Sequence, residues 1–147
     1  MAQPLKYIST IMNNKIIYII DDDIITVFGI RKLLKAYCDN QPIPSFENGQ
    51  LAFDTIVSQI ESGKEIPDII FLDINMPIMD GWQFLEALSK LNISKKIKIN
   101  IITSSIDSAD YEKWLYYQKI TPHCLNFMNK PILKILPEDI SFMDKAS

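Results

Sequence analysis

Short apolar runs that stop abruptly at polar residues are the feature of this sequence that most constrains its fold. The run Ile69–Leu72 follows Pro67 and Asp68 and stops at Asp73, and the run Ile16–Ile20 stops at three consecutive aspartates. Such runs are typical of strands buried on both faces of a parallel sheet. Open α/β sheets place their ligands beyond the carboxyl ends of the strands, so the residues that follow these runs are candidates for chemistry.

Helical patterns alternate with five such runs along the chain, which has 147 residues and the size of one domain. The expected strands are Lys15–Ile20, Pro42–Phe46, Asp68–Leu72, Ile97–Ile102 and Cys124–Met128. The expected helices are Ile24–Tyr37, Leu51–Ile60, Trp82–Leu91, a fourth after Asp107 and a short fifth from Pro137 to about Met143. This alternation predicts a doubly wound α/β fold, with parallel strands and helices on both faces of the sheet. Periodicity alone leaves the strand order open.

Two local patterns refine this prediction. Apolar residues of the first helix, among them Ile24, Val27, Phe28 and Ile30, recur at spacings of three and four, which predicts a stripe packed on the sheet. The prolines of the second strand predict that it lies at a sheet edge.

Composition narrows the functional classes. The net charge is -3 and no basic patch is clustered, which argues against nucleic-acid binding. The densest basic run, Lys95, Lys96 and Lys98, is expected in a solvated loop. No apolar run of about 18 residues occurs, so no membrane insertion is expected. Cys38 and Cys124 lack the spacing of a metal site and fit a reduced, cytoplasmic setting.

The segment 1–14 has no sustained apolar pattern, and we expect a disordered or non-native extension there. Residues 15–147 are expected to form the one domain, without repeats. Since the sequence stops near Ser147, we expect a stand-alone module.

Four of the five strand ends carry residues suited to chemistry, and the second strand carries none. They are Asp21-Asp22-Asp23, Asp73, Thr103-Ser104, and Lys130 before Pro131. In a parallel sheet these ends share one edge. Each motif alone is more often a turn or a helix cap, but the four together predict a site that handles phosphate.

The residue types explain why. Clustered carboxylates repel one another unless a cation neutralises them, and Mg²⁺ accepts one or two carboxylates beside phosphate oxygens. A carboxylate can also attack phosphorus and form an aspartyl phosphate. Lys130 would pair with the carboxylate or phosphate, and the Thr103 hydroxyl would donate to a phosphate oxygen. Phosphoryl transfer needs chiefly such positioning and charge neutralisation.

In order and spacing, these motifs resemble those of response-regulator receiver domains, the CheY-like family of two-component signalling. The matching segments are Asp21 to Asp23, Leu72 to Gly81, Ile102 to Ser104 and Phe127 to Pro131. The resemblance extends from about Lys15 to Met143. It implies a flavodoxin-like sheet with strand order 2-1-3-4-5.

The resemblance also implies roles at the site. Asp73 would accept a phosphoryl group from a sensor histidine kinase or a histidine phosphotransfer protein. Asp21 and Asp22 would form the acidic pair, and Asp22, Asp73 and the backbone carbonyl of Asn75 would hold Mg²⁺. Lys130 would contact the phosphate.

A conformational switch is implied as well. Thr103 and Phe127 would be its two members, and Ser104 stands where an alanine is more usual. The short last helix reduces the usual output face. The resemblance implies no enzyme activity beyond the chain's own phosphoryl transfer and autodephosphorylation. The expected output is a changed affinity for a downstream protein that the sequence does not name.

Two alternatives stay open. A phosphatase of the haloacid dehalogenase type would also use Mg²⁺ and an aspartyl phosphate, but its Asp-x-Asp-x-Thr pattern would need threonine at Ile25, and Thr26 is one place late. It would also leave Asp73 without a role. A pseudo-receiver that binds partners without phosphate should have lost Asp73, Lys130 or an acidic residue, and none is missing.

Four further residues carry weaker expectations. His123 is expected at the surface or partly buried, without a chemical role. Trp114 is expected to pack inward while one or both of Tyr116 and Tyr117 are exposed, unless the three form a partner-binding face.

Overall fold

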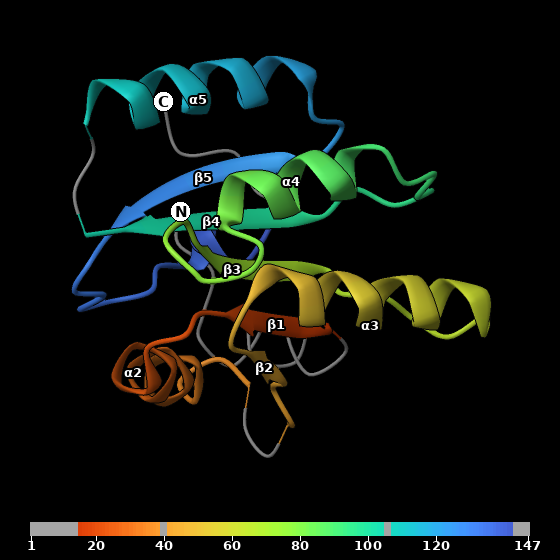
Figure 1. Ribbon diagram of the computed structural model, residues 1–147. Coiled ribbons are helices and arrows are strands. Elements are labelled where there is room, and N and C mark those ends of the chain that lie inside the picture. The colour runs from red at the N-terminus through yellow and green to blue at the C-terminus, as the bar shows by residue number, and fades with distance from the viewer. Residues whose placement is uncertain (1–14, 39–40, 105–106, 143–147) are drawn as a thin grey trace.

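The computed structural model describes residues 15–38, 41–104 and 107–142, where five strands form one parallel sheet (Figure 1). The strands are β1 Ile17–Ile20, β2 Ser45–Phe46, β3 Ile69–Asp73, β4 Lys98–Thr103 and β5 Cys124–Asn129. Their order across the sheet is β2-β1-β3-β4-β5. The predicted fold and strand order are therefore confirmed. The expected extension, residues 1–14, lies outside the described residues.

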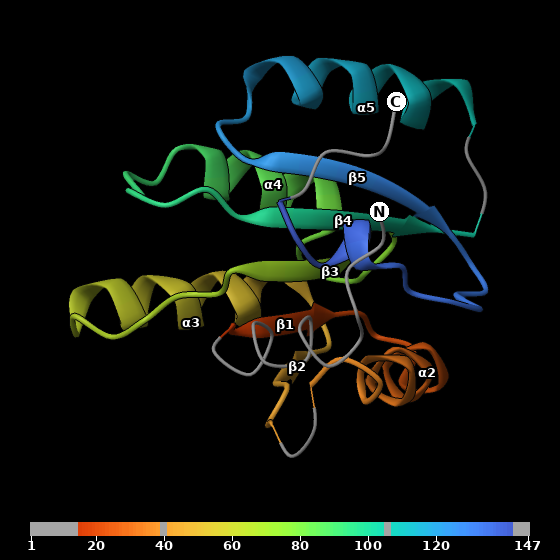
Figure 2. The same ribbon diagram turned by 180° about the vertical axis from the view of Figure 1, so that it is seen from behind.

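Helices cover both faces of the sheet (Figures 1 and 2). The helix α2, Ile24–Leu34, packs on one face, while α3 Gly49–Glu61, α4 Gly81–Ser89 and α5 Ser108–Ile120 lie on the other. None of the helices in the described ranges has the length and apolar character needed to cross a membrane.

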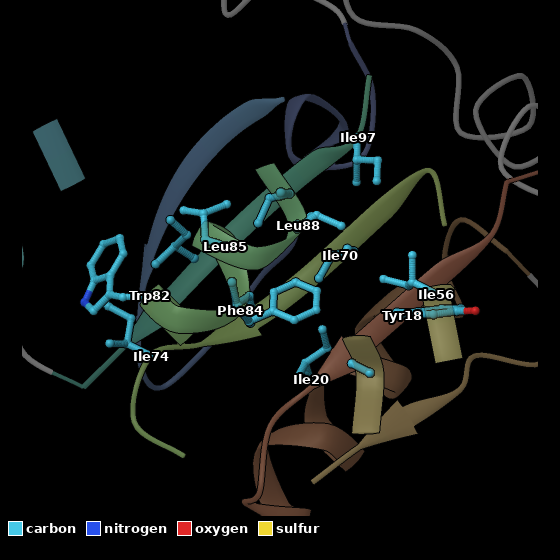
Figure 3. Close-up of a cluster of buried hydrophobic side chains, with 14 of the residues drawn as sticks. Tyr18, Ile20, Ile56, Ile70, Ile74, Trp82, Phe84, Leu85, Leu88 and Ile97 are labelled. Carbon is cyan, nitrogen blue, oxygen red and sulfur yellow. The ribbon is translucent and has the colours of Figure 1, made fainter. Parts of the chain in front are cut away.

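The larger core lies between the sheet and α3 and α4. Figure 3 shows Ile20 of β1 and Ile70 of β3 facing Ile56 of α3 and Phe84 of α4. The intervening strand residues, such as Ile19 and Phe71, point into the second core beneath α2. Because β1 and β3 are buried on both faces, their register is fixed firmly, and so are the positions where they end.

The last predicted helix, Pro137 to about Met143, was wrong in its extent. The structure has a 3₁₀ turn, η1 Pro137–Asp139, and Met143 lies outside the described residues. The Asn100 side chain of β4 donates to the Asp139 backbone carbonyl (2.8 Å), which a continuing helix would need as an acceptor. The Asp139 carboxylate accepts from Leu136 N (2.8 Å) and from the Asn126 amide of β5 (3.0 Å). A buried polar network therefore holds an irregular tail across β4 and β5 where a helix was expected.

Tertiary contacts also override three smaller predictions. Strand β2 is only two residues long, although its place at a sheet edge is confirmed. The Arg31 guanidinium of α2 donates to the Ile43 carbonyl (2.8 Å), so part of the expected strand is bonded to a side chain instead. Ile24 and Phe28 do not belong to the buried stripe, because both point to solvent. Lys98 lies in β4 and is buried, not in a solvated loop.

Helix α5 is the least embedded of the α-helices in the described ranges, since it has no buried residue. Its inward side consists of aromatic contacts. Trp114 meets Phe127 of β5 edge-on at 5.2 Å between ring centroids, and Tyr117 stacks on Trp82 of α4 at 5.6 Å. The Trp82 indole N–H donates to Asp110 of α5 (3.1 Å). Trp114 and Tyr117 thus face inward, and only Tyr116 of the three aromatic residues is exposed.

Candidate functional site

The site forms where β1, β3 and β5 end at one edge of the sheet. Asp21 follows β1 directly, Asp73 is the last residue of β3, and Lys130 follows β5. The strands bring these side chains together as the strand-end argument predicts. Thr103 ends the intervening strand β4, where its carbonyl accepts a hydrogen bond from Lys130 N (2.8 Å).

Three carboxylates crowd this edge. One oxygen from each of Asp21, Asp22 and Asp73 lies within 4.8 Å of the other two. Asp21 and Asp73 are buried, whereas Asp22 is exposed and closes the group on the solvent side. Asp21 is oriented by Asp23, whose backbone N–H donates to its Oδ1 (2.9 Å). Asp23 itself does not join the group, because it caps α2 by accepting from Ile25 N (3.0 Å).

Lys130 supplies the positive charge of the site. Its Nζ lies 3.1 Å from Asp21 Oδ2 and 3.6 Å from Asp73 Oδ1. Burial lowers the pKa of Lys130, but the charges of Asp21 and Asp73 outweigh that effect and raise the pKa above its ordinary value. The ammonium is therefore held charged between the two buried carboxylates.

One lysine does not neutralise this acidic group. Burial and the charge of Asp21 raise the pKa of Asp73 to about 7, although Lys130 acts in the opposite direction. Burial likewise raises the pKa of Asp21, again against the influence of Lys130. Such shifts mean that the ionised forms need further positive charge. Three converging oxygen ligands with a deficit of positive charge fit a small hard cation such as Mg²⁺.

The loop after β3 places Asp73 against the first turn of α4. Gly81 N donates to the Ile74 carbonyl (2.9 Å), and a Cβ on Gly81 would lie 2.5 Å from the Asp73 carbonyl oxygen. Only glycine permits this approach. Asp80 and Gln83 form a reciprocal capping box at the start of α4. Ile78 adopts a φ of 69° in this loop and is exposed, an unusual conformation for a β-branched residue.

The other predicted site residues lie around this centre. Asn75 is exposed, and its backbone N–H donates to Asp73 Oδ1 (3.4 Å). Thr103 is buried, while the neighbouring Ser104 is exposed. Phe127 is half-buried, with its ring against Trp114 of α5.

His123 was misplaced by the sequence argument, because it is buried. Its Nδ1 accepts a hydrogen bond from Ile97 N (3.1 Å), which ties the start of β5 to the start of β4. Burial and the charge of Lys96 lower the pKa of His123, so the ring is neutral. It lies at the amino ends of the strands and plays no part at the acidic edge.

A groove that was not predicted from the sequence lies beside the carboxylates. Asp21, Asp22 and Glu47 line it together with apolar residues of α2 and α3 such as Phe28 and Leu51. Glu47 directly follows β2, so the second strand also delivers an acidic residue to this edge. The signal was present in the sequence, because Glu47 comes straight after the predicted strand.

Comparisons with known proteins agree with this geometry. A family model described as the response regulator receiver domain matches residues 17–132. Sporulation initiation phosphotransferase F of Bacillus subtilis is 34% identical over 95 residues, which are 63% of this chain and 66% of that protein. The sensor histidine kinase CheAY of Helicobacter pylori is 35% identical over 54 residues, 37% of this chain and 7% of that protein. The chain thus covers less than two thirds of the length of either relative.

Solved structures show the same fold at low sequence identity. The receiver domain of the histidine kinase CKI1 from Arabidopsis thaliana, complexed with Mg²⁺ and BeF₃⁻, has a TM-score of 0.64 at 16% identity, with 88% of this chain and 89% of that one covered. Chemotaxis protein CheY4 of Vibrio cholerae has a TM-score of 0.62 at 18% identity, with 85% and 91% covered.

Proposed function

This chain belongs to the response regulator receiver domain family of phosphorelay signalling, and on that premise we propose that Asp73 is its phosphoacceptor. The donor is a phosphohistidine of a sensor histidine kinase or of a histidine phosphotransfer protein in the cytoplasm. One observation carries the proposal: the Asp73 carboxylate is buried at the end of β3, beside two further carboxylates and the Lys130 ammonium. Transfer forms a bond between Asp73 oxygen and phosphorus and breaks the bond from phosphorus to the histidine nitrogen.

Mg²⁺ is the proposed cofactor, with Asp21, Asp22 and Asp73 as its side-chain ligands and the Asn75 carbonyl as a backbone ligand. When bound, it supplies the positive charge that the carboxylates and the incoming phosphate oxygens require. The converging oxygens and the raised pKa of Asp73 support this assignment. The Lys130 ammonium remains beside the acceptor and neutralises a phosphate oxygen.

The surface beside the acidic edge supports a protein donor. Three side chains on the first turns of α2 point to solvent: Ile24 is 77% exposed, Ile25 81% and Phe28 69%. Ile78 in the loop after β3 and Leu133 after β5 are equally exposed. A large apolar surface around a charged site is typical of a protein interface. It would desolvate the phosphoryl group when a histidine-bearing partner docks.

The proposed output is a changed affinity for a downstream protein. A phosphoryl group on Asp73 would attract the Thr103 hydroxyl and let Phe127 move inward, which would release its contact with Trp114 of α5. Such a switch shifts a population, and a full reversal would need about 5 kcal/mol of differential stabilisation. We propose no activity on other molecules besides this transfer and autodephosphorylation.

The test is incubation of the whole chain with Mg²⁺ and acetyl phosphate, followed by intact mass measurement. Wild type should gain one phosphoryl group, and Asp73→Asn should gain none. Asp80→Asn is the matched control, because Asn caps a helix as well as Asp does and the residue lies seven positions beyond the acceptor. An adduct that persists in Asp73→Asn, or no adduct with either acetyl phosphate or a phosphohistidine protein, would refute the assignment.

A further inference from the structure

The face of β4 and β5 that the tail crosses is unusually polar. Lys98 and Asn100 of β4 are buried beside Cys124 and Asn126 of β5, and the register pairs Lys98 with Cys124 and Asn100 with Asn126. The two asparagines are explained by the tail, because both donate to Asp139. Lys98 and Cys124 have no role in that network or at the acidic edge.

Lys98 is an anomaly by itself. It is only 6% exposed, yet no carboxylate within the described ranges lies within 4.0 Å of its ammonium. Lysine is almost never buried so deeply without an ionic partner. Lys95 in the same basic run pairs with Asp68 at 3.0 Å, and Lys130 pairs with Asp21. Among the described residues, the group that meets the Lys98 Nζ is the Cys124 sulfur, at 3.8 Å.

We propose that Lys98 and Cys124 form an oxidation site, in which Cys124 reacts with hydrogen peroxide and Lys98 captures the product as a sulfur–nitrogen cross-link. The Lys98 ammonium lies 3.8 Å from the Cys124 sulfur, so it can give a proton to the hydroxide that leaves peroxide. Cys124 is half-buried, so a small oxidant can reach it, whereas Cys38 is buried and its thiol donates to the Leu34 carbonyl (3.3 Å).

The chemistry has two steps. The Cys124 thiolate attacks one peroxide oxygen, an S–O bond forms, the O–O bond breaks, and the departing hydroxide takes a proton from the Lys98 ammonium to give water. The Lys98 amine then attacks the sulfenic sulfur, an S–N bond forms, the S–O bond breaks, and the second hydroxide takes a proton from nitrogen to give a second water. Sulfur loses two electrons and peroxide gains two. Condensation of a sulfenic acid with nitrogen is known protein chemistry.

The cross-link would join β4 to β5 at their amino ends, whereas Asp73 and Lys130 lie at the carboxyl edge of the sheet. Oxidation should therefore leave the acetyl phosphate reaction unchanged. For that reason the proposal stands or falls independently of the phosphoacceptor assignment.

The experiment uses the whole chain in a Cys38→Ser background, which removes any disulfide between the two cysteines. After hydrogen peroxide, the mass should fall by two hydrogens, a digest should contain Lys98 joined to Cys124, and a thiol reductant should restore the original mass. Cys124→Ser should give no such product. Thermal unfolding of each variant checks that it folds.

Two substitutions of Lys98 separate its charge from its capture of sulfur. Lys98→Arg keeps the charge, so dimedone should still trap a sulfenic acid at Cys124, but no cross-link should form. Lys98→Met removes the charge, and dimedone labelling should slow by about tenfold. The proposal is overturned if Cys124 is oxidised equally fast with lysine and methionine at position 98, or if no sulfur–nitrogen product forms while Lys98 is present.

Discussion

The half of the sheet built on β1 and β3 differs from the half built on β4 and β5 in how it holds the groups of the site. Every residue of β1 and β3 is buried. Asp21 comes directly after β1, and Asp73 is the last residue of β3. Strand β5 is only partly buried, its covering helix α5 has no buried residue, and an irregular tail replaces a last helix. Asp73 thus ends a strand that is buried throughout, whereas on the other half only β4 is buried throughout and Lys130 follows the partly buried β5.

This difference matches what the two sides would do in a switch. A nucleophile must stay in place while the phosphoryl group arrives, which favours a dense core. Elements that change position must instead come from regions of low local stability. The proposed switch residue Phe127 and its neighbour Trp114 lie on that looser side.

The sharpest contrast between buried and exposed packing comes from two phenylalanines. Phe71→Ala in β3 should lower the free energy of unfolding by about 3–5 kcal/mol, because it leaves a cavity in a fully buried site. Phe28→Ala on α2 should change it by less than about 0.5 kcal/mol, because that ring is largely in solvent. Urea denaturation measures both. A similar loss for the two variants would show that β3 is less tightly packed than its burial indicates.

A second contrast uses two glycines. Gly81→Ala should cost about 3 kcal/mol, because its Cβ would press on the backbone of Asp73 and Ile74, which cannot rotate away. Gly29→Ala meets nothing within 4 Å inside α2 and should stabilise the protein by about 0.5–1 kcal/mol. Thermal denaturation shows whether each substitution lowers or raises the stability of the protein. A neutral Gly81→Ala would mean that the loop after β3 is free to relax.

The tail should be sensitive to Asn100. Asn100→Ala removes the donor to the Asp139 carbonyl and the acceptor of the Asn126 amide, so it should cost about 2 kcal/mol. The tail should then open more often, and trypsin should cut after the exposed Lys134 faster than in wild type. Asn92→Ala, at an exposed position, is the control and should leave both readouts unchanged. Unchanged proteolysis of Asn100→Ala would show that the network does not hold the tail.

The smallest expected effect is the pH dependence due to His123. Burial lowers its pKa in the folded state, so the unfolded chain binds a proton first as pH falls below about 6.5. Stability from the neutral ring is complete above that pH and is lost as pH falls toward the folded pKa, with a slope of at most about 1.4 kcal/mol per unit. His123→Asn keeps an acceptor for Ile97 N and should lose this slope in urea titrations near pH 6. If the stability of wild type and of His123→Asn changed with pH in the same way, this prediction would be wrong.

Local sequence was sufficient where burial on both faces made the pattern unambiguous. The run before Asp73 could only be an interior strand, and its end therefore placed the carboxylate at the edge where Asp21 and Lys130 also lie. The convergence of these three residues was predictable because parallel strands share that edge.

Sequence was insufficient where a distant side chain decides the outcome. The Pro137 helix fails because Asn100, 39 residues earlier, takes the Asp139 carbonyl. Ile24 and Phe28 fit a helical period, but α2 buries one narrow stripe, and the period does not say which apolar residues lie outside it. In the sequence Lys98 is part of a charged run, but in the structure it pairs with residues of both neighbouring strands and lies in β4.

Arg31 has a consequence for the solubility of the whole molecule. An outer strand offers unpaired carbonyls and N–H groups to the strands of other chains, which is a common route to aggregation. At β2 and in the residues just before it, the guanidinium of Arg31 donates to the Ile43 carbonyl and Ser45 Oγ, and Pro42 and Pro44 contribute no N–H groups. One arginine side chain from α2 and two prolines therefore occupy or remove hydrogen-bonding groups at this edge of the sheet. This disfavours pairing with the edge strand of a neighbouring molecule.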